Sequence, residues 1–176
     1  MRAGERITPP GTRYCDSSSV KATDRCTVLS PKWFAFIVRA ALSHACRHAD
    51  YVTLVTIRAS REYVGSTIDV GAQALSEIAD IIDPTIRAAD MVGELEDGHL
   101  GILLSDADED AAAGIIRRVA EKQVHVRFTA PLTFAIGAAS CPSHGVHAAD
   151  LVAHAMAHPL LDVRSGSALL GDPCAC

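Results

Sequence analysis

The chain has 176 residues, of which 49% are hydrophobic and 21% are charged, a composition that suits one globular domain. It excludes a collagen, a coiled coil and a wholly disordered chain. Lys and Arg number 16 against 21 for Asp and Glu, a formal net charge of -5, so we expect neither a nucleic-acid nor a membrane-surface partner. Any anion site must therefore be a local cluster of cations.

Residues 1–23 are rich in Pro and Ser and show no apolar period, which predicts a flexible leader. The chain has no signal peptide and no apolar run of about 18 residues, so we expect a cytoplasmic protein. The last residues, 171–176, are expected to form a short tail.

The cysteines and histidines suggest metal binding only weakly. Six cysteines occur at irregular spacing and are expected to be reduced thiols: Cys15, Cys26, Cys46, Cys141, Cys174 and Cys176. Two histidine pairs, His44 with His48 and His154 with His158, have the four-residue spacing of one helix face. Because there is neither a C-x-x-C pair nor an H-E-x-x-H motif, we expect no metal site.

The first half of the domain predicts a helix, a strand and a second helix. The first helix begins at Ser30 and Pro31 and runs to about His48, with the Ser30 hydroxyl capping free backbone N–H groups. Residues 51–57 are rich in β-branched side chains and predict a buried strand. Apolar residues at helical spacing then predict a helix over residues 69–82.

The second half predicts four strands and two helices. Residues 91–95 and 99–104 form a hairpin through Asp97-Gly98, a dipeptide typical of tight turns. The other predicted elements are helices at 106–122 and 148–158 and strands at 124–128 and 132–139. This order contains β-α-β-β-α-β, so we expect an α/β (α+β) fold with a ferredoxin-like core, a mainly antiparallel central sheet flanked by helices.

Four parts of the chain match a known family in order and spacing. They are Asp24 to Phe34, Leu75 to Val92, Leu132 to Gly137 and the single residue Gly166. Together they resemble the GGDEF domain, the diguanylate cyclase family that condenses two GTP molecules into cyclic di-GMP. The resemblance implies one GGDEF-like domain over residues 24–170.

The same resemblance implies that the family's active site is degenerate in this chain. The five signature letters fall on Glu96-Asp97-Gly98-His99-Leu100, and the family's D-x-D falls on Thr56-Ile57-Arg58. Cyclase chemistry needs two divalent metals held by carboxylates from these two places. The guanine-reading aspartate falls on Ala72, and a phosphate-binding lysine of the last helix falls on Val163. We therefore expect no cyclase activity, no metal site and no cofactor.

A ligand site is nevertheless implied beside the signature. Arg87-Ala-Ala-Asp90 stands where the family carries its R-x-x-D product-binding motif, and Arg118 stands near a further arginine that assists it. A guanidinium offers planar, bidentate donors to phosphate and to guanine. We therefore expect an inactive signalling domain that binds cyclic di-GMP through Arg87, Asp90 and Arg118. The alternative for Arg87 and Asp90 is a surface ion pair of little energetic value.

The sequence leaves two other functions open. A domain without cyclase activity can serve as a protein-interaction or dimerisation module with no nucleotide ligand, as a homodimer or with a protein partner. It can also be a regulatory domain that binds GTP without metal, because Arg58 and His99 stand where the family has metal-binding anions.

Overall fold

The computed structural model describes residues 28–63, 66–125, 128 and 132–164. The predicted leader and tail, Gly166 and the first four residues of the family resemblance lie outside these ranges. The bounds of the domain, 24–170, stay a prediction.

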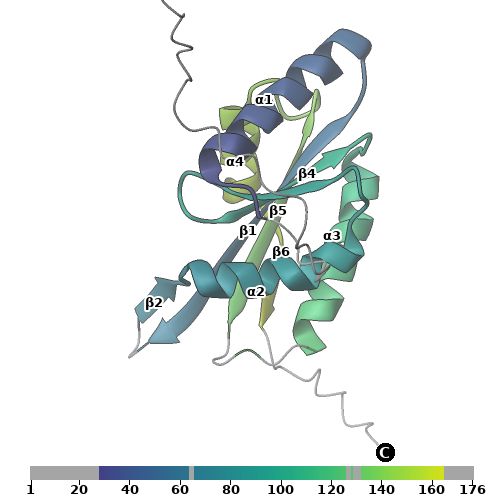
Figure 1. Ribbon diagram of the computed structural model, residues 1–176. Helices are drawn as coiled ribbons and strands as arrows, with labels where there is room; N and C mark the ends of the chain where they lie inside the picture. Colours follow the sequence, from purple (N-terminus) through teal and green to yellow (C-terminus); the bar gives the residue numbers. More distant parts are fainter. Residues whose placement is uncertain (1–27, 64–65, 126–127, 129–131, 165–176) are drawn as a thin grey trace, which may run out of the picture.

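The elements follow one another as helix, two strands, helix, two strands, helix, strand, helix, strand (Figure 1). They are α1 (Pro31–His48), β1 (Val52–Tyr63), β2 (Ser66–Asp69), α2 (Ala72–Ile82), the short 3-10 helix η1 (Asp83–Thr85), β3 (Met91–Glu94), β4 (Leu100–Ser105), α3 (Glu109–His125), β5 (Thr133–Cys141), α4 (Ala148–Ala157) and β6 (Pro159–Arg164). Among the described helices, none is long and apolar enough to cross a membrane.

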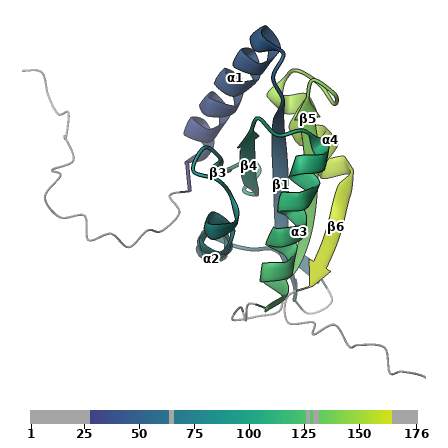
Figure 2. The same cartoon turned by 90° about the vertical axis from the view of Figure 1, so that its right-hand side faces the viewer.

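The strands form one sheet in the order β3-β4-β1-β5-β6, with β2 paired to β1. All of these pairings are antiparallel. Figure 2 shows β1, β5 and β6 side by side. The run β1-α2-β3-β4-α3-β5 is the predicted β-α-β-β-α-β core, so the predicted fold class is confirmed.

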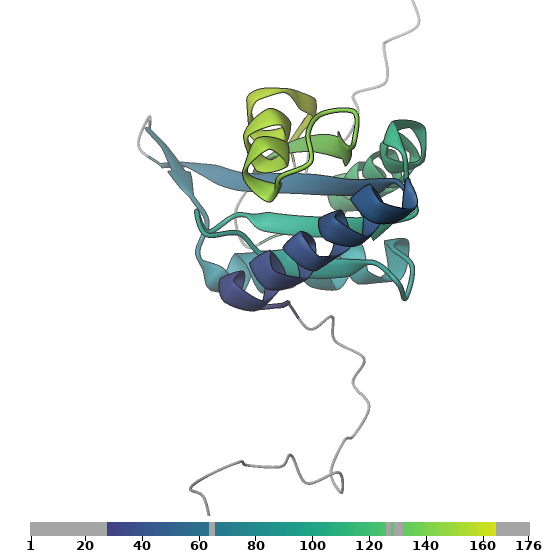
Figure 3. The same ribbon diagram turned by 90° about the horizontal axis from the view of Figure 1, so that it is seen from above.

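Alternation along the strands separates two apolar layers, because successive side chains of a strand point to opposite faces. On β1, Val55 and Ile57 are buried against α2 and α3. Leu54 is buried against α1 and α4, on the other face. Figure 3 looks onto α1 and α4 from above the sheet. Both faces of the sheet are therefore covered by a pair of helices.

The start of α1 is held by backbone pairing rather than by a side-chain cap. Ser30 is extended at the N-cap position, as predicted, but its hydroxyl makes no capping hydrogen bond. Instead, the Leu29 N–H donates to the Val92 carbonyl at 3.0 Å, and the Glu94 N–H donates to the Leu29 carbonyl at 2.9 Å. These two bonds fix the chain beside β3 immediately before the helix begins.

Two predicted elements had wrong bounds, and one strand, β6, was not predicted. The strand predicted at 124–128 does not form at its start, because Val124 and His125 continue α3. Val124 stands eight residues after Ile116 and so continues the helical period of that segment. The helix predicted from Asp69 begins at Ala72, because Ser66–Asp69 pair with β1. Pro159 does end α4, but the chain continues as β6, an edge strand in which a missing N–H is tolerated.

Candidate functional site

The hairpin between β3 and β4 is a tight turn stabilised by its own polar groups. Leu95 N–H donates to the His99 carbonyl at 2.8 Å, and Gly98 N–H donates to the Leu95 carbonyl at 3.0 Å. Gly98 has φ +81°, a conformation that favours glycine. The Asp97 carboxylate accepts the His99 N–H at 3.3 Å. The predicted Asp97-Gly98 turn is therefore confirmed.

His99 points into the protein at this turn. It is 8% exposed, and its Nε2 lies 4.0 Å from the second carboxylate oxygen of Asp97. Glu96 and Asp97 are exposed beside it. The turn therefore presents two carboxylates to solvent and one imidazole to the interior.

The two β1 positions predicted for metal-binding acids differ in burial. Thr56 is 1% exposed and lies between Gly101 of β4 and Gly137 of β5 in the strand register. Arg58 follows two residues later and is exposed. Neither side chain carries a carboxylate. Within the described ranges, no group of three or more His, Cys, Asp and Glu side chains is arranged to hold a metal ion.

The positions predicted for base and phosphate recognition lie on other elements. Ala72 is the first residue of α2. Val163 lies on β6 opposite Phe134 of β5. The resemblance places the family's lysine on its last helix, whereas in this chain α4 ends at Ala157 and Val163 follows on β6. Both elements run beside β1 near Arg58, because the Val70 N–H donates to the Ala59 carbonyl at 3.3 Å and Phe134 lies opposite Ala59.

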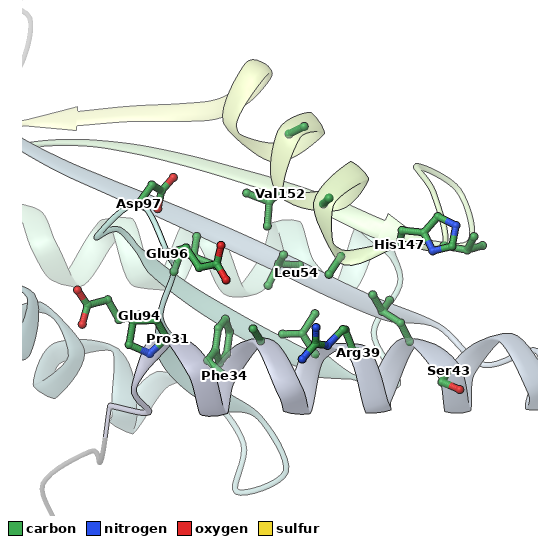
Figure 4. A pocket seen from close by; sticks show the side chains of 18 of the residues that line it. Pro31, Phe34, Arg39, Ser43, Leu54, Glu94, Glu96, Asp97, His147 and Val152 are labelled. Atoms are coloured by element: carbon green, nitrogen blue, oxygen red, sulfur yellow. The ribbon is translucent and has the colours of Figure 1, made fainter.

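A groove of about 920 Å³ lies between α1, α4 and the hairpin (Figure 4). Its apolar lining includes Phe34, Val38, Leu42, Leu54 and Val152. Two of the predicted site residues, Glu96 and Asp97, line one end, and Glu94 lies beside them. Arg39 lines the α1 wall, and His147 lies at the far end in Figure 4.

Two of the three carboxylates at the hairpin end of the groove have no partner among the described residues, and the third, Asp97, lies beside His99. Glu94 and Glu96 make no side-chain hydrogen bond and no ion pair with any described residue. A groove with an apolar floor and free carboxylates at one end suits an occupant with an apolar surface and a cationic group. It does not suit a triphosphate.

The Arg87–Asp90 segment lies outside that groove and is organised around Asp90. Asp90 is 9% exposed, and one of its carboxylate oxygens accepts the Arg87 backbone N–H at 2.9 Å. The other accepts the Ser105 N–H at 3.3 Å. The predicted ion pair between the two side chains was wrong, because the carboxylate meets the main chain of Arg87 and not its guanidinium. Asp90 thus joins this turn to the end of β4.

Arg118 is brought to the same segment from α3. Its Nη2 donates to the Thr85 carbonyl at 3.5 Å, and both Arg118 and Arg87 are exposed. The structure therefore places two exposed arginines on neighbouring segments, beside an aspartate whose carboxylate already accepts two backbone N–H groups.

The predicted histidine pairs are confirmed, and a third histidine joins one of them. The ring centroids of His44 and His48 are 4.3 Å apart, and those of His154 and His158 are 4.7 Å apart. His144 lies 4.2 Å from His154 and accepts the Ser140 N–H at Nδ1. Partial burial lowers the pKa of His154, and the two neighbouring imidazoles lower it further, against the attraction of Glu109.

The groove was not predicted from the sequence. It is formed where α1 and α4 pack on one face of the sheet, and these helices are separated by about 100 residues of chain. No local motif marks it, because its lining side chains follow the same apolar period as an ordinary helix core.

Comparisons with known proteins agree with the fold. The family profile described as "Diguanylate cyclase, GGDEF domain" matches residues 64–158. No curated protein matches the chain. The GGDEF domain of YfiN (TpbB) from Pseudomonas aeruginosa is 20% identical, with 74% of this chain and 87% of that chain covered and a TM-score of 0.60.

Two further structures extend this likeness. A DGC protein from Thermotoga maritima is 14% identical, with 76% of this chain and 96% of that chain covered and a TM-score of 0.62. The GGDEF domain of DgcB from Caulobacter crescentus, solved in complex with c-di-GMP, is 11% identical, with 89% and 90% covered and a TM-score of 0.59. The profile match covers more than half of the 176 residues, and the TM-scores show that the fold agrees with these structures. The chain belongs to the GGDEF domain family, which is related to the diguanylate cyclases.

Proposed function

We propose that this GGDEF-family domain makes no cyclic di-GMP and acts by binding. This proposal is carried by the residues that stand at the two places where the family's metal ligands are expected. The hairpin offers Gly98 and His99 there, and β1 offers Thr56 and Arg58. The chain has no Gly-Gly dipeptide at all. These residues do not fit two divalent metal ions, which need oxygen ligands and charge neutralisation.

The test is a direct assay of the product. The purified full chain is incubated with GTP and Mg²⁺ or Mn²⁺, and cyclic di-GMP is measured by liquid chromatography with mass spectrometry. We expect no product above a tag-only control, while an active diguanylate cyclase run in parallel shows that the assay works. Cyclic di-GMP formed in proportion to the amount of this protein would contradict the proposal.

The ligand we propose is cyclic di-GMP, bound at Arg87 and Arg118. Both guanidinium groups are exposed on neighbouring segments, and a guanidinium binds phosphate through paired, charge-assisted hydrogen bonds. The DgcB domain described above was solved with the same nucleotide. Asp90 contributes mainly by fixing the turn, since its two carboxylate oxygens already accept backbone N–H groups.

Calorimetry separates this ligand from a purely structural motif. We expect cyclic di-GMP to release heat with the wild type, and Arg87→Ala or Arg118→Ala to weaken binding about 10-fold or more, because each removes charged hydrogen bonds. Arg47→Ala, an exposed arginine on α1, is the matched control and should bind like wild type. The receptor proposal fails if the wild type gives no heat.

The groove favours a second candidate, a protein-interaction module. Its apolar floor and free carboxylates suit a helix of a partner, or of a second copy, that carries a basic residue at one end. Ala153 is exposed and lines the groove, so Ala153→Arg should block it without disturbing the core. Ala113→Arg, at an exposed position on α3, is the control.

Light scattering after size-exclusion chromatography measures self-association directly. A dimer that is lost in Ala153→Arg and retained in Ala113→Arg supports a groove-mediated homodimer. A monomer at every concentration would rule out the homodimer. Metal-independent GTP binding is not favoured by the groove, because Glu94, Glu96 and Asp97 at its hairpin end repel a triphosphate.

A further inference from the structure

Two cysteines far apart in the chain face each other where α1 meets the sheet. The Sγ atoms of Cys46, in the last turn of α1, and Cys141, the last residue of β5, are 3.9 Å apart. Both are free thiols. Cys141 is 1% exposed, whereas Cys46 is exposed and lines the groove. The pair therefore has one thiol that reaches solvent and one that does not.

The packing of both elements keeps this pair in place. Cys141 is held in the sheet opposite Val52 of β1. On the helix side, Leu42 and Ala45 are buried in the same apolar cluster as Cys141. The end of α1 is closed by the Asp50 N–H, which donates to the Ala45 carbonyl at 3.1 Å. A disulfide needs an S–S distance of about 2.05 Å, so the two sulfurs have to approach by about 2 Å, within reach of side-chain rotation.

We propose that Cys46 and Cys141 form an oxidative modification site that hydrogen peroxide converts into a disulfide. The inference does not depend on which ligand the domain binds. The difference in exposure assigns the roles. The exposed Cys46 meets the oxidant, and the buried Cys141 reacts in the second step.

The chemistry is balanced by one peroxide for each pair. The Cys46 thiolate attacks one peroxide oxygen, the O–O bond breaks, and Cys46 becomes a sulfenic acid with release of one water after proton uptake. The Cys141 sulfur then attacks the Cys46 sulfur, the S–O bond breaks, and the Cys141 proton leaves with the hydroxyl as a second water. The two thiols lose two electrons in total, and the peroxide gains them.

The environment of Cys141 agrees with this order of events. Burial raises the pKa of the Cys141 thiol, and its contact with Cys46 raises it further, so Cys141 stays protonated at neutral pH. A protonated, buried thiol is a poor first target for peroxide, but it can react with a sulfenic acid formed beside it.

The disulfide would tie the end of α1 to the sheet along one wall of the groove. It would link residues separated by 95 positions in the sequence, and cross-links that close long loops restrict the unfolded chain strongly. We expect oxidation to raise the melting temperature by about 5–10 °C, less than an ideal cross-link would, because the sulfurs have to move.

The experiment maps the disulfide in the full chain. Reduced protein is treated with one equivalent of hydrogen peroxide, free thiols are blocked with N-ethylmaleimide, and the peptides are analysed by mass spectrometry without reduction. A variant with Cys15, Cys26, Cys174 and Cys176 all changed to Ser removes competing thiols. We expect a peptide pair joined through Cys46 and Cys141 in both proteins, and a rise in melting temperature that dithiothreitol reverses.

Two variants test the assigned roles. Cys46→Ser should give no cross-link and no rise in melting temperature. Cys141→Ala should leave the sulfenic acid on Cys46, where dimedone traps it. The proposal is overturned if the four-serine variant keeps both thiols free after peroxide treatment, or if dimedone labels Cys141 in Cys46→Ser faster than it labels Cys46 in Cys141→Ala.

Discussion

Phe34 of α1 packs against the sheet at two glycines, and this contact gives a quantitative test of the fold. Phe34 is 1% exposed. A Cβ atom built on Gly93 of β3 or on Gly101 of β4 would overlap its ring. The ring therefore occupies space that a side chain on either strand would need. Substitutions on the two sides of this contact should consequently compensate for one another.

The magnitudes follow from the packing. Phe34→Ala removes a fully buried ring and should cost about 3–5 kcal/mol of unfolding free energy. Gly101→Ala forces the ring aside and should cost about 1–3 kcal/mol. In the double variant the new methyl group enters the space that the ring has left, so most of its penalty should vanish and only its approach to Leu95 Cδ2 at 3.2 Å remains. We expect a favourable coupling energy of about 1–3 kcal/mol.

Urea unfolding of the four proteins of this cycle, followed by circular dichroism, measures the coupling. Gly114→Ala on α3 is the matched control, because a Cβ there has its nearest neighbour at 4.0 Å, and it should stabilise the helix by about 0.5–1 kcal/mol. The packing argument is refuted if the effects of Phe34→Ala and Gly101→Ala are additive within about 0.5 kcal/mol.

Two further predictions concern buried polar and titrating groups. Thr53 donates to the Ala107 carbonyl at 2.7 Å, and its hydroxyl oxygen lies 2.7 Å from that of Ser140. Thr53→Val should cost about 1–3 kcal/mol in the same urea assay, because it leaves two buried groups without a partner, and an unchanged midpoint would contradict this. The pKa of His154 in the folded state is below the ordinary histidine value of 6.5, so its contribution to stability is present above pH 6.5 and is lost as the pH falls through the lowered pKa. The melting temperature should therefore fall more between pH 7.5 and pH 5.5 for the wild type than for His154→Gln. An equal fall in the two proteins would show that His154 is not responsible.

Local sequence patterns determined a large part of this fold. The apolar period from Phe34 to Ala45 predicted α1, and the β-branched run that begins at Val52 predicted β1. The Asp97-Gly98 dipeptide predicted the hairpin, because a tight turn depends only on the backbone conformation of its own residues. The spacing of several short motifs predicted the GGDEF family, which the profile match shows.

The tertiary structure decided the features that depend on contacts between distant segments. β2 and β6 form because β1 and β5 offer them free edges, and such a partner cannot be read from a short window. The structural role of Asp90 also depends on a distant contact, because its carboxylate accepts a hydrogen bond from the N–H of Ser105, 15 residues away in the sequence. The groove and the facing thiols of Cys46 and Cys141 exist only because α1, α4 and β5 meet on one face of the sheet. The sequence alone determined the family and most of the elements, but only packing determined which side chains meet, because close approach between distant residues is set by the docked elements and not by local propensity.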